Sequence, residues 1–276
     1  MAGSRISMHL KRWITGLALL PALIAVIVAG GLPLVLFVAL VCAVTLYEYL
    51  RIVTADRPAD RRDSCSLLLL AAGPAVVLSA HFDAPGLVVG ILALNFLLVG
   101  IVNTVGYALG RSVSVSLVGR QVLGSVYIAL PLALVVLMRH DPSGVAWVFW
   151  LLFLVFPGDI GAFYVGSYLG RHKLCPAVSP KKTVEGALGG FAASAAVGAI
   201  FKVLFLPDLA WDATLALFLC VGIVAPFGDL FESVLKRIGG IKDSGGILPG
   251  HGGMLDRIDA LLFAIPVVYL FRVFVF

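Results

Sequence analysis

Charged residues are scarce in this chain. Only 13% of its 276 residues are Asp, Glu, Lys or Arg, whereas 61% are hydrophobic, and the mean hydropathy is +1.08. Soluble globular domains carry about 25% charged residues, so the composition excludes a soluble domain and indicates a membrane protein. The four cysteines are scattered and form no CxxC pair. We therefore expect neither a structural disulfide nor a zinc site.

Long linkers, internal repeats and low-complexity segments are also lacking, so we expect residues 1–276 to form a single membrane domain. A transmembrane helix needs about 20 mostly apolar residues. This criterion predicts an all-α integral membrane protein with nine spans, over residues 13–30, 32–50, 65–80, 86–109, 121–138, 145–170, 186–206, 214–235 and 258–275. The first span follows basic residues as a signal peptide would, but a second span follows at once without a cleavage site. We expect the first span to be retained as a helix.

The basic residues predict how the spans are oriented. With nine spans, 17 of the 20 Lys and Arg residues fall on one side of the membrane, and only Arg139, Lys202 and Arg272 fall elsewhere. Because Lys and Arg gather in cytoplasmic loops, we expect the N-terminus in the cytoplasm and the C-terminus outside. This placement accounts for the net charge of +5, so we expect no nucleic acid partner.

Polar residues within the spans divide the chain into two parts. Residues 1–144 contain ordinary spans, whereas Asp159, Glu185, Asp229 and Glu232 lie within or at the edges of later spans. A charged residue at membrane depth costs about 2.5–3.5 kcal/mol on insertion scales, so it should face a partner or a wet cavity. We expect residues 1–144 to act as a scaffold and residues 145–276 to carry an active site.

The polar stretch 233–259 combines seven glycines with acidic and basic residues. Asp229 precedes it at the end of the eighth span, and Asp256 opens the ninth span on the same side of the membrane. Simpler interpretations are a local ion pair of Asp229 or Glu232 with Lys236 or Arg237, and helix capping by Asp256. We favour Asp229 and Asp256 as ligands of Mg²⁺, because two carboxylates together with substrate phosphates commonly hold this ion.

A second polar loop precedes the seventh span. Thr183 is the expected N-cap of that helix, and the helix N-terminus with the lysines before it would form an anion site. The alternative is an ordinary basic anchor loop. On the flanking spans, Gly166 with Gly170 and the series Gly190, Ser194, Gly198 form stripes of small residues. We interpret the stripes as helix packing, within one subunit or between subunits, so a homodimer stays open.

Several segments resemble the phosphatidate cytidylyltransferases, which are the CDP-diacylglycerol synthases. The resemblance is carried by long matches at residues 179–186 (SPKKTVEG) and 233–259, and by shorter ones at 14–16, 48–50 and 158–163. It implies that CTP and phosphatidate react to CDP-diacylglycerol and pyrophosphate, with Mg²⁺, at the cytoplasmic face of a bacterial-type inner membrane. In that family the carboxylates corresponding to Asp229 and Asp256 are associated with metal binding.

The attacking group would be a lipid phosphate, already ionised at neutral pH, so the reaction needs alignment and charge neutralisation rather than a strong base. The residues expected to act in catalysis are Lys181, Lys236, Arg237, Lys242, Asp243, His251 and Arg257. Those expected to bind or position substrate are Asp159, Ser179, Thr183, Glu185, Ser233, Gly252, Gly253 and Asp259. Whether a second, monovalent cation takes part stays open.

Three other functions compete with this one. A cytidylyltransferase for another lipid phosphate and a CTP-dependent polyprenol kinase would need the same two loops, because both handle CTP and a lipid. A lipid transporter would usually place its site near the bilayer midplane between repeated halves. Here the polar residues gather at one face and no repeat is found, so transport is the weakest alternative.

Overall fold

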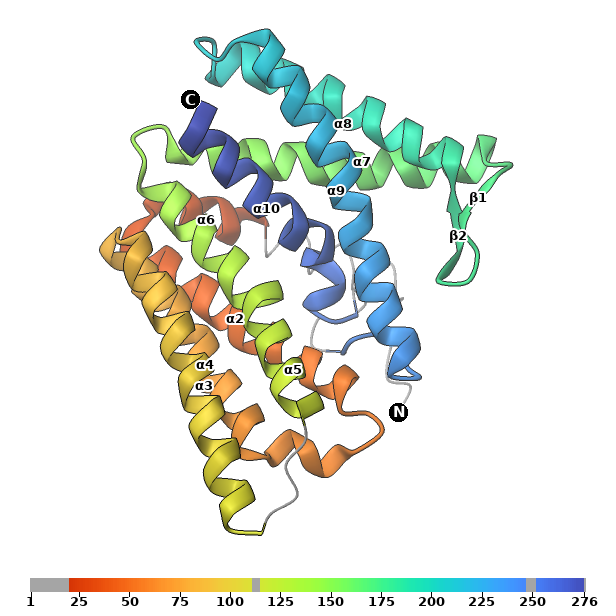
Figure 1. Ribbon diagram of the computed structural model, residues 1–276. Helices are drawn as coiled ribbons and strands as arrows, with labels where there is room; N and C mark the ends of the chain where they lie inside the picture. Colours follow the sequence, from red (N-terminus) through yellow and green to blue (C-terminus); the bar gives the residue numbers. More distant parts are fainter. Residues whose placement is uncertain (1–19, 111–114, 247–251, 276) are drawn as a thin grey trace, which may run out of the picture.

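A computed structural model of the chain describes residues 20–110, 115–246 and 252–275. Most of its backbone is helical (Figure 1). The long helices are α2 (Gly31–Val53), α3 (Ser64–Ser79), α4 (Pro85–Ala108), α5 (Val115–Gly124), α6 (Leu130–His140), α7 (Gly144–Leu169), α8 (Val184–Phe205), α9 (Trp211–Ile238) and α10 (Leu255–Val275). Short helical segments are η1 (Pro58–Arg62), η2 (Ala80–Phe82) and the π-helical η3 (Ser125–Ala129).

Within the described ranges, eight helical stretches are long and apolar enough to cross a membrane. They coincide with the second to ninth predicted spans, and α5, η3 and α6 together form the span Val115–His140. The prediction of an all-α integral membrane protein is confirmed. The first predicted span, 13–30, lies partly outside the described residues, and its described part is a helix over Leu20–Ala29.

Helix α10 joins two groups of helices (Figure 1). In the first group, α3 packs against α2, α4 and α6. In the second group, α7 lies along α8, and α9 contacts both of them. Helix α10 packs against α9 and α7 as well as α6 and α2, so it contacts both groups.

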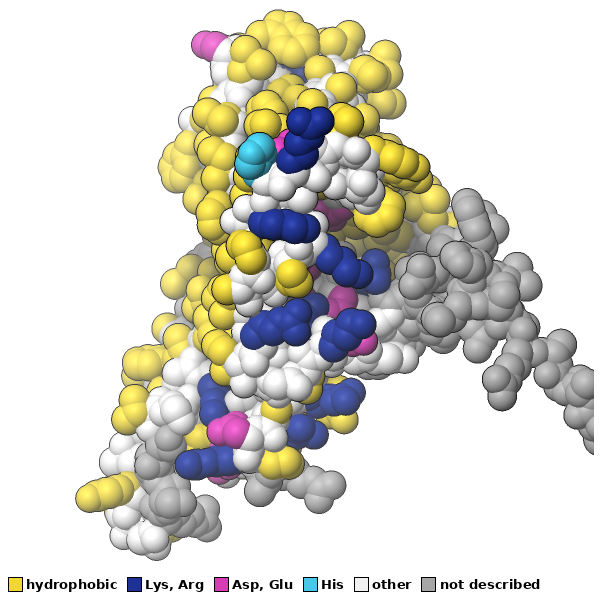
Figure 2. All heavy atoms as spheres, turned by 90° about the vertical axis from the view of Figure 1, so that its right-hand side faces the viewer, with side chains coloured by type: hydrophobic (Ala, Val, Ile, Leu, Met, Phe, Trp, Pro, Cys, Tyr) yellow, Lys and Arg dark blue, Asp and Glu magenta, His cyan; other side chains and the backbone are white. Residues whose placement is uncertain are grey.

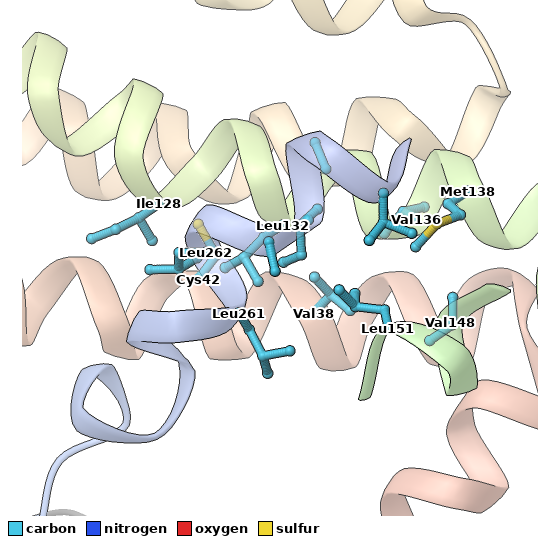
Figure 3. Packing of buried hydrophobic residues seen from close by; sticks show 14 of the residues in the cluster. Val38, Cys42, Ile128, Leu132, Val136, Met138, Val148, Leu151, Leu261 and Leu262 are labelled. Carbon is cyan, nitrogen blue, oxygen red and sulfur yellow. The ribbon is translucent and has the colours of Figure 1, made fainter. Parts of the chain in front are cut away.

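The buried core lies where α10 meets α2, α6 and α7. Cys42 of α2, Leu132 of α6, Leu151 of α7 and Leu262 of α10 gather there (Figure 3) and are all buried. Lipid tails are as apolar as these side chains, so close van der Waals packing, rather than escape from water, stabilises such a core. The thiol of Cys42 serves as one more small apolar group, and all four cysteines are free.

A β-hairpin connects α7 to α8, where the sequence analysis expected a loop. Strand β1 (Lys173–Cys175) pairs antiparallel with β2 (Ser179–Thr183), and Figure 1 shows the hairpin projecting from the end of the α7–α8 pair. Thr183 ends the hairpin and caps α8, because its Oγ1 accepts a hydrogen bond of 3.1 Å from Gly186 N. The predicted N-cap is confirmed.

Candidate active site

A cavity of about 730 Å³ lies between α7, α8, α9, the start of α10 and the hairpin. One part of its wall is polar and carries lysines and aspartates from the hairpin, α7, α9 and α10. Another part is apolar and includes Leu154, Phe191 and Val221. Charged groups and membrane-spanning apolar surface therefore meet in one cavity, as a substrate with a phosphate head and a lipid tail requires.

The α7–α8 wall depends on small residues. A Cβ atom added to Gly190 would lie 2.7 Å from the carbonyl oxygen of Gly158, so only glycine permits this approach. One turn further along α8, Ser194 Oγ donates a hydrogen bond of 2.6 Å to Leu154 O. The small-residue stripe of α8 thus serves helix packing within one chain, as the sequence analysis favoured.

Asp229 of α9 pairs with a lysine of the hairpin. Lys182 Nζ lies 2.7 Å from Asp229 Oδ2, and Ser233 Oγ, one turn further along α9, is 3.4 Å from Oδ1. Both Lys182 and Asp229 line the cavity. The sequence analysis placed the lysines of this loop at an anion site, but it named only Lys181 among the catalytic residues.

Asp256 of α10 is held on several sides. Lys236 Nζ lies 2.7 Å from its Oδ1, while Gly253 N and Ser244 N donate to its Oδ2 over 2.9 and 3.2 Å. Lys236 also forms an ion pair with the buried Glu232 one turn earlier on α9. The ion pair of Glu232 with Lys236 that the sequence suggested is therefore present. Lys236 also links α9 to α10 through Asp256.

The remaining carboxylates form a cluster around this part of the cavity. The negative charges of Asp159, Asp229 and Asp259 act on one another, and Lys182 and Arg257 offset the charge of Asp159. Among the described residues, no three His, Cys, Asp or Glu side chains converge closely enough to hold a metal ion by themselves. Mg²⁺ commonly uses only one or two carboxylates and completes its shell with water and substrate phosphates, so this set of hard oxygen donors fits Mg²⁺ shared with a substrate.

Eight of the 17 predicted site residues line the cavity. The predicted residues that line it are Asp159, Lys181, Thr183, Asp229, Lys236, Asp256, Arg257 and Asp259. Ser233 contacts the cavity through Asp229, and Gly253 through its bond to Asp256. Gly252 has a φ of 82°, and a Cβ atom there would lie 2.9 Å from Asp256 Oδ2. Glycine at position 252 therefore lets the chain turn around that carboxylate.

Other predicted residues lie outside the cavity lining. Glu185 binds the start of the hairpin, where it accepts hydrogen bonds from Arg171 N at 3.0 Å and from His172 N at 3.1 Å. Arg237 Nε donates to Val178 O at 3.3 Å, which ties the hairpin turn to α9. The predicted residues not in contact with the cavity are Ser179, Glu185, Arg237, Lys242 and Asp243. His251 lies outside the described residues.

Basic side chains gather on the face of the molecule that carries the hairpin. Figure 2 shows Lys and Arg in a column on this face, with Asp and Glu between them and hydrophobic surface beside the column. Lys173, Lys181 and Arg257 are exposed there and border the cavity. Such a surface attracts anionic lipids and nucleotides.

The sequence analysis gave no role to Glu48. This residue of α2 is fully buried, and its Oε2 accepts hydrogen bonds from Leu255 N at 2.9 Å and Ser244 Oγ at 3.2 Å. Glu48 is the only charged residue of the predicted span 32–50. An isolated carboxylate in a span is itself a signal for function, and that signal was present in the sequence.

Comparisons with known proteins identify the family of the chain. A model of the Cytidylyltransferase family matches residues 10–275. The chain is 32% identical to the phosphatidate cytidylyltransferase of Bacillus subtilis (strain 168) over 260 residues, which cover 94% of this chain and 96% of that protein. It is 44% identical to the proteins of the same name from Synechocystis sp. and Brucella suis biovar 1, over 136 and 140 residues that cover about half of each chain. The chain therefore belongs to the cytidylyltransferase family.

Proposed function

We propose that this protein transfers the cytidylyl group of CTP to phosphatidate. A phosphate oxygen of the lipid attacks the α-phosphorus of CTP, a new P–O bond forms, the bond between the α-phosphorus and the bridging oxygen breaks, and pyrophosphate leaves. The products are CDP-diacylglycerol and pyrophosphate. The observation that carries the proposal is a cavity in which four lysines (Lys173, Lys181, Lys182 and Lys236) and Arg257 adjoin the apolar surface of α7, α8 and α9.

The cations of the cavity would hold the reacting phosphates in line. Lys181 and Lys182 precede the N-terminus of α8, where the helix dipole adds to their attraction for an anion. Lys236 and Arg257 approach from α9 and α10. Since the attacking phosphate is already ionised, these groups contribute mainly by orienting it and by neutralising charge near the α-phosphorus.

Bound Mg²⁺ would supply further charge neutralisation on the triphosphate of CTP. We propose Asp229 and Asp256 as its ligands, because both are hard oxygen donors that line the cavity, one on each of two neighbouring helices. Asp159 and Asp259 add negative charge beside them, which favours a cation at this position. A monovalent cation as a second ion remains an open proposal.

We place the protein in the inner membrane of a bacterium, with the cavity facing the cytoplasm, where CTP is made. The support is the excess of Lys and Arg on the face that carries the cavity (Figure 2). A homodimer also remains a proposal. The small residues of α8 pack against α7 of the same chain, so they give no support for a dimer. Cross-linking in the membrane would test for a homodimer.

The function is tested with detergent-purified protein, Mg²⁺ and CTP labelled at the α-phosphate. We expect labelled CDP-diacylglycerol and one pyrophosphate per turnover with phosphatidate, and no labelled lipid with polyprenyl phosphate. CDP released without pyrophosphate, together with a phosphorylated polyprenol, would assign the protein to the kinases instead. The absence of CTP turnover with every lipid, from protein that remains folded, would contradict the proposal.

A further inference from the structure

We propose that Glu48 is a positioning residue for the active site, and that it acts on Asp256 through the segment that joins α9 to α10. The proposal rests on the proposed function for the reaction that is assayed. Glu48 belongs to α2, in the first helix group, whereas the described residues that line the cavity run from Leu154 to Asp259. It would therefore be a contribution of the scaffold half to the site.

A single oxygen of Glu48 holds both ends of the segment between α9 and α10. Oε2 accepts the hydrogen bond of Ser244 Oγ, six residues after the end of α9, and that of Leu255 N, the first residue of α10. Glu48 and Ser244 are both fully buried. Because both donors reach the same oxygen, one side chain fastens both ends of the segment to α2.

Two glycines of the segment make room for this carboxylate. A Cβ atom on Gly253 would lie 2.6 Å from Glu48 Oε2, and a Cβ atom on Gly245 would overlap Glu48 Oε1. From the sequence alone, these glycines would be attributed to a close approach of backbone and substrate phosphate. In the structure, Gly245 and Gly253 pack on a buried side chain.

The segment that Glu48 holds is also the one that holds Asp256. Ser244 does not line the cavity, but its backbone N–H donates a hydrogen bond to Asp256 Oδ2, as does the N–H of Gly253. Glu48 binds the hydroxyl of Ser244, and Asp256 binds its amide. A loss of the Glu48 carboxylate would release these two amides and with them the orientation of Asp256 toward Lys236 and the cavity.

The matched test compares Glu48→Gln with Asp141→Asn. Both changes turn a carboxylate into an amide, but Asp141 pairs with Arg272 at the end of α7 that is remote from the hairpin. Amide hydrogen exchange would be measured on the full-length protein in detergent, without substrate. Because the change alters the group that accepts the bonds of both Ser244 and Leu255, we expect residues 244–256 to exchange at least about 10-fold faster in Glu48→Gln, with α7 and α8 unchanged.

Steady-state kinetics complete the comparison. With phosphatidate and CTP, we expect the kcat of Glu48→Gln to fall at least about 10-fold and both KM values to stay within about 3-fold, since Asp256 acts on the reacting groups. Asp141→Asn should change neither the exchange of residues 244–256 nor kcat. Ser244→Ala is a milder second variant, because it removes one bond to Glu48 and keeps the backbone N–H for Asp256, and it should shift both readouts in the same direction.

Two outcomes would overturn the proposal. Unchanged exchange of residues 244–256 in both Glu48→Gln and Ser244→Ala would show that Glu48 does not hold the segment. A uniform rise in exchange over all helices would show a general loss of stability instead of positioning. If the wild-type protein forms no CDP-diacylglycerol, the proposed function fails, while the exchange of residues 244–256 still decides whether Glu48 positions the segment.

Discussion

Two ion pairs between elements contribute charged side chains to the cavity wall. Lys182 of the hairpin pairs with Asp229 of α9, and Lys236 of α9 pairs with Asp256 of α10. Groups at the membrane boundary need such partners, because an unpaired charge there is costly. The same ion pairs present their lysines and carboxylates to one space, where a substrate phosphate can interact with the lysines and a cation with the carboxylates.

Replacement of Asp229 by Asn tests the carboxylate proposed to bind Mg²⁺. We expect kcat for CDP-diacylglycerol formation to fall at least about 100-fold, as is usual when one preorganised charge at a reacting phosphate is lost. The control is Asp212→Asn in the first turn of the same helix, outside the cavity lining, where activity should stay within about 2-fold. Full Mg²⁺-dependent turnover of Asp229→Asn would remove this residue as a ligand.

At the scale of elements, the α7–α8 pair forms one wall of the cavity. Its helices approach closely at Gly158 and Gly190, and both residues also line the cavity. The hairpin that follows α7 is fixed at its base, where Glu185 binds the backbone before β1, and at its turn, where Arg237 binds Val178 O. Helix packing and hairpin position therefore decide together where Lys181 and Lys182 lie.

A larger side chain at Gly190 would test this wall. In Gly190→Val the new Cβ atom would lie 2.7 Å from Gly158 O and 3.0 Å from Ala162 Cβ. Overpacking of this kind costs about 1–3 kcal/mol, so we expect a lower Tm in detergent and lower turnover. Gly100→Val in α4 is the control, because nothing lies within 4 Å of a Cβ atom there, and it should leave both unchanged. Equal Tm values for the two variants would contradict close α7–α8 packing.

At the scale of the whole molecule, the distribution of cations is consistent with the predicted orientation. The three cations outside the predicted cytoplasmic loops all have partners in the structure. Arg139 donates to backbone carbonyls of the helix over Leu20–Ala29, Lys202 donates to the backbone after α8, and Arg272 pairs with Asp141. These positive charges are used in local contacts, so they do not weaken the argument from the basic loops.

Cysteine labelling tests the orientation itself. Cys175 lies in strand β1 of the hairpin, on the face predicted to be cytoplasmic. With the other three cysteines, Cys42, Cys65 and Cys220, replaced by Ala, a membrane-impermeant maleimide should label Cys175 in inverted vesicles and leave it unlabelled in intact cells. Asp208→Cys, in the exposed turn between α8 and α9, should label in the opposite pattern when Cys175 is also replaced. Labelling of Cys175 from outside the cell would reverse the predicted orientation.

The spans and much of the site could be predicted from the sequence. A long apolar run in a bilayer must satisfy its backbone hydrogen bonds internally, and a helix does so within the segment. For this reason the eight described spans follow from hydropathy alone, and the Thr183 cap follows from local chemistry at a helix start. Asp159, Lys181, Asp229 and Asp256 stood out because polar residues are rare in such a chain.

Only the tertiary structure decided which of these groups meet. The bond between Glu48 and Leu255 joins residues 207 positions apart, and the pair of Lys182 with Asp229 joins strand β2 to helix α9. Periodicity and local propensity carry no information about such contacts, because they arise from how α2, α9 and α10 pack on one another. The sequence by itself determined that this is a helical membrane protein with a polar site, and helix packing determined that Glu48 holds the segment beside Asp256.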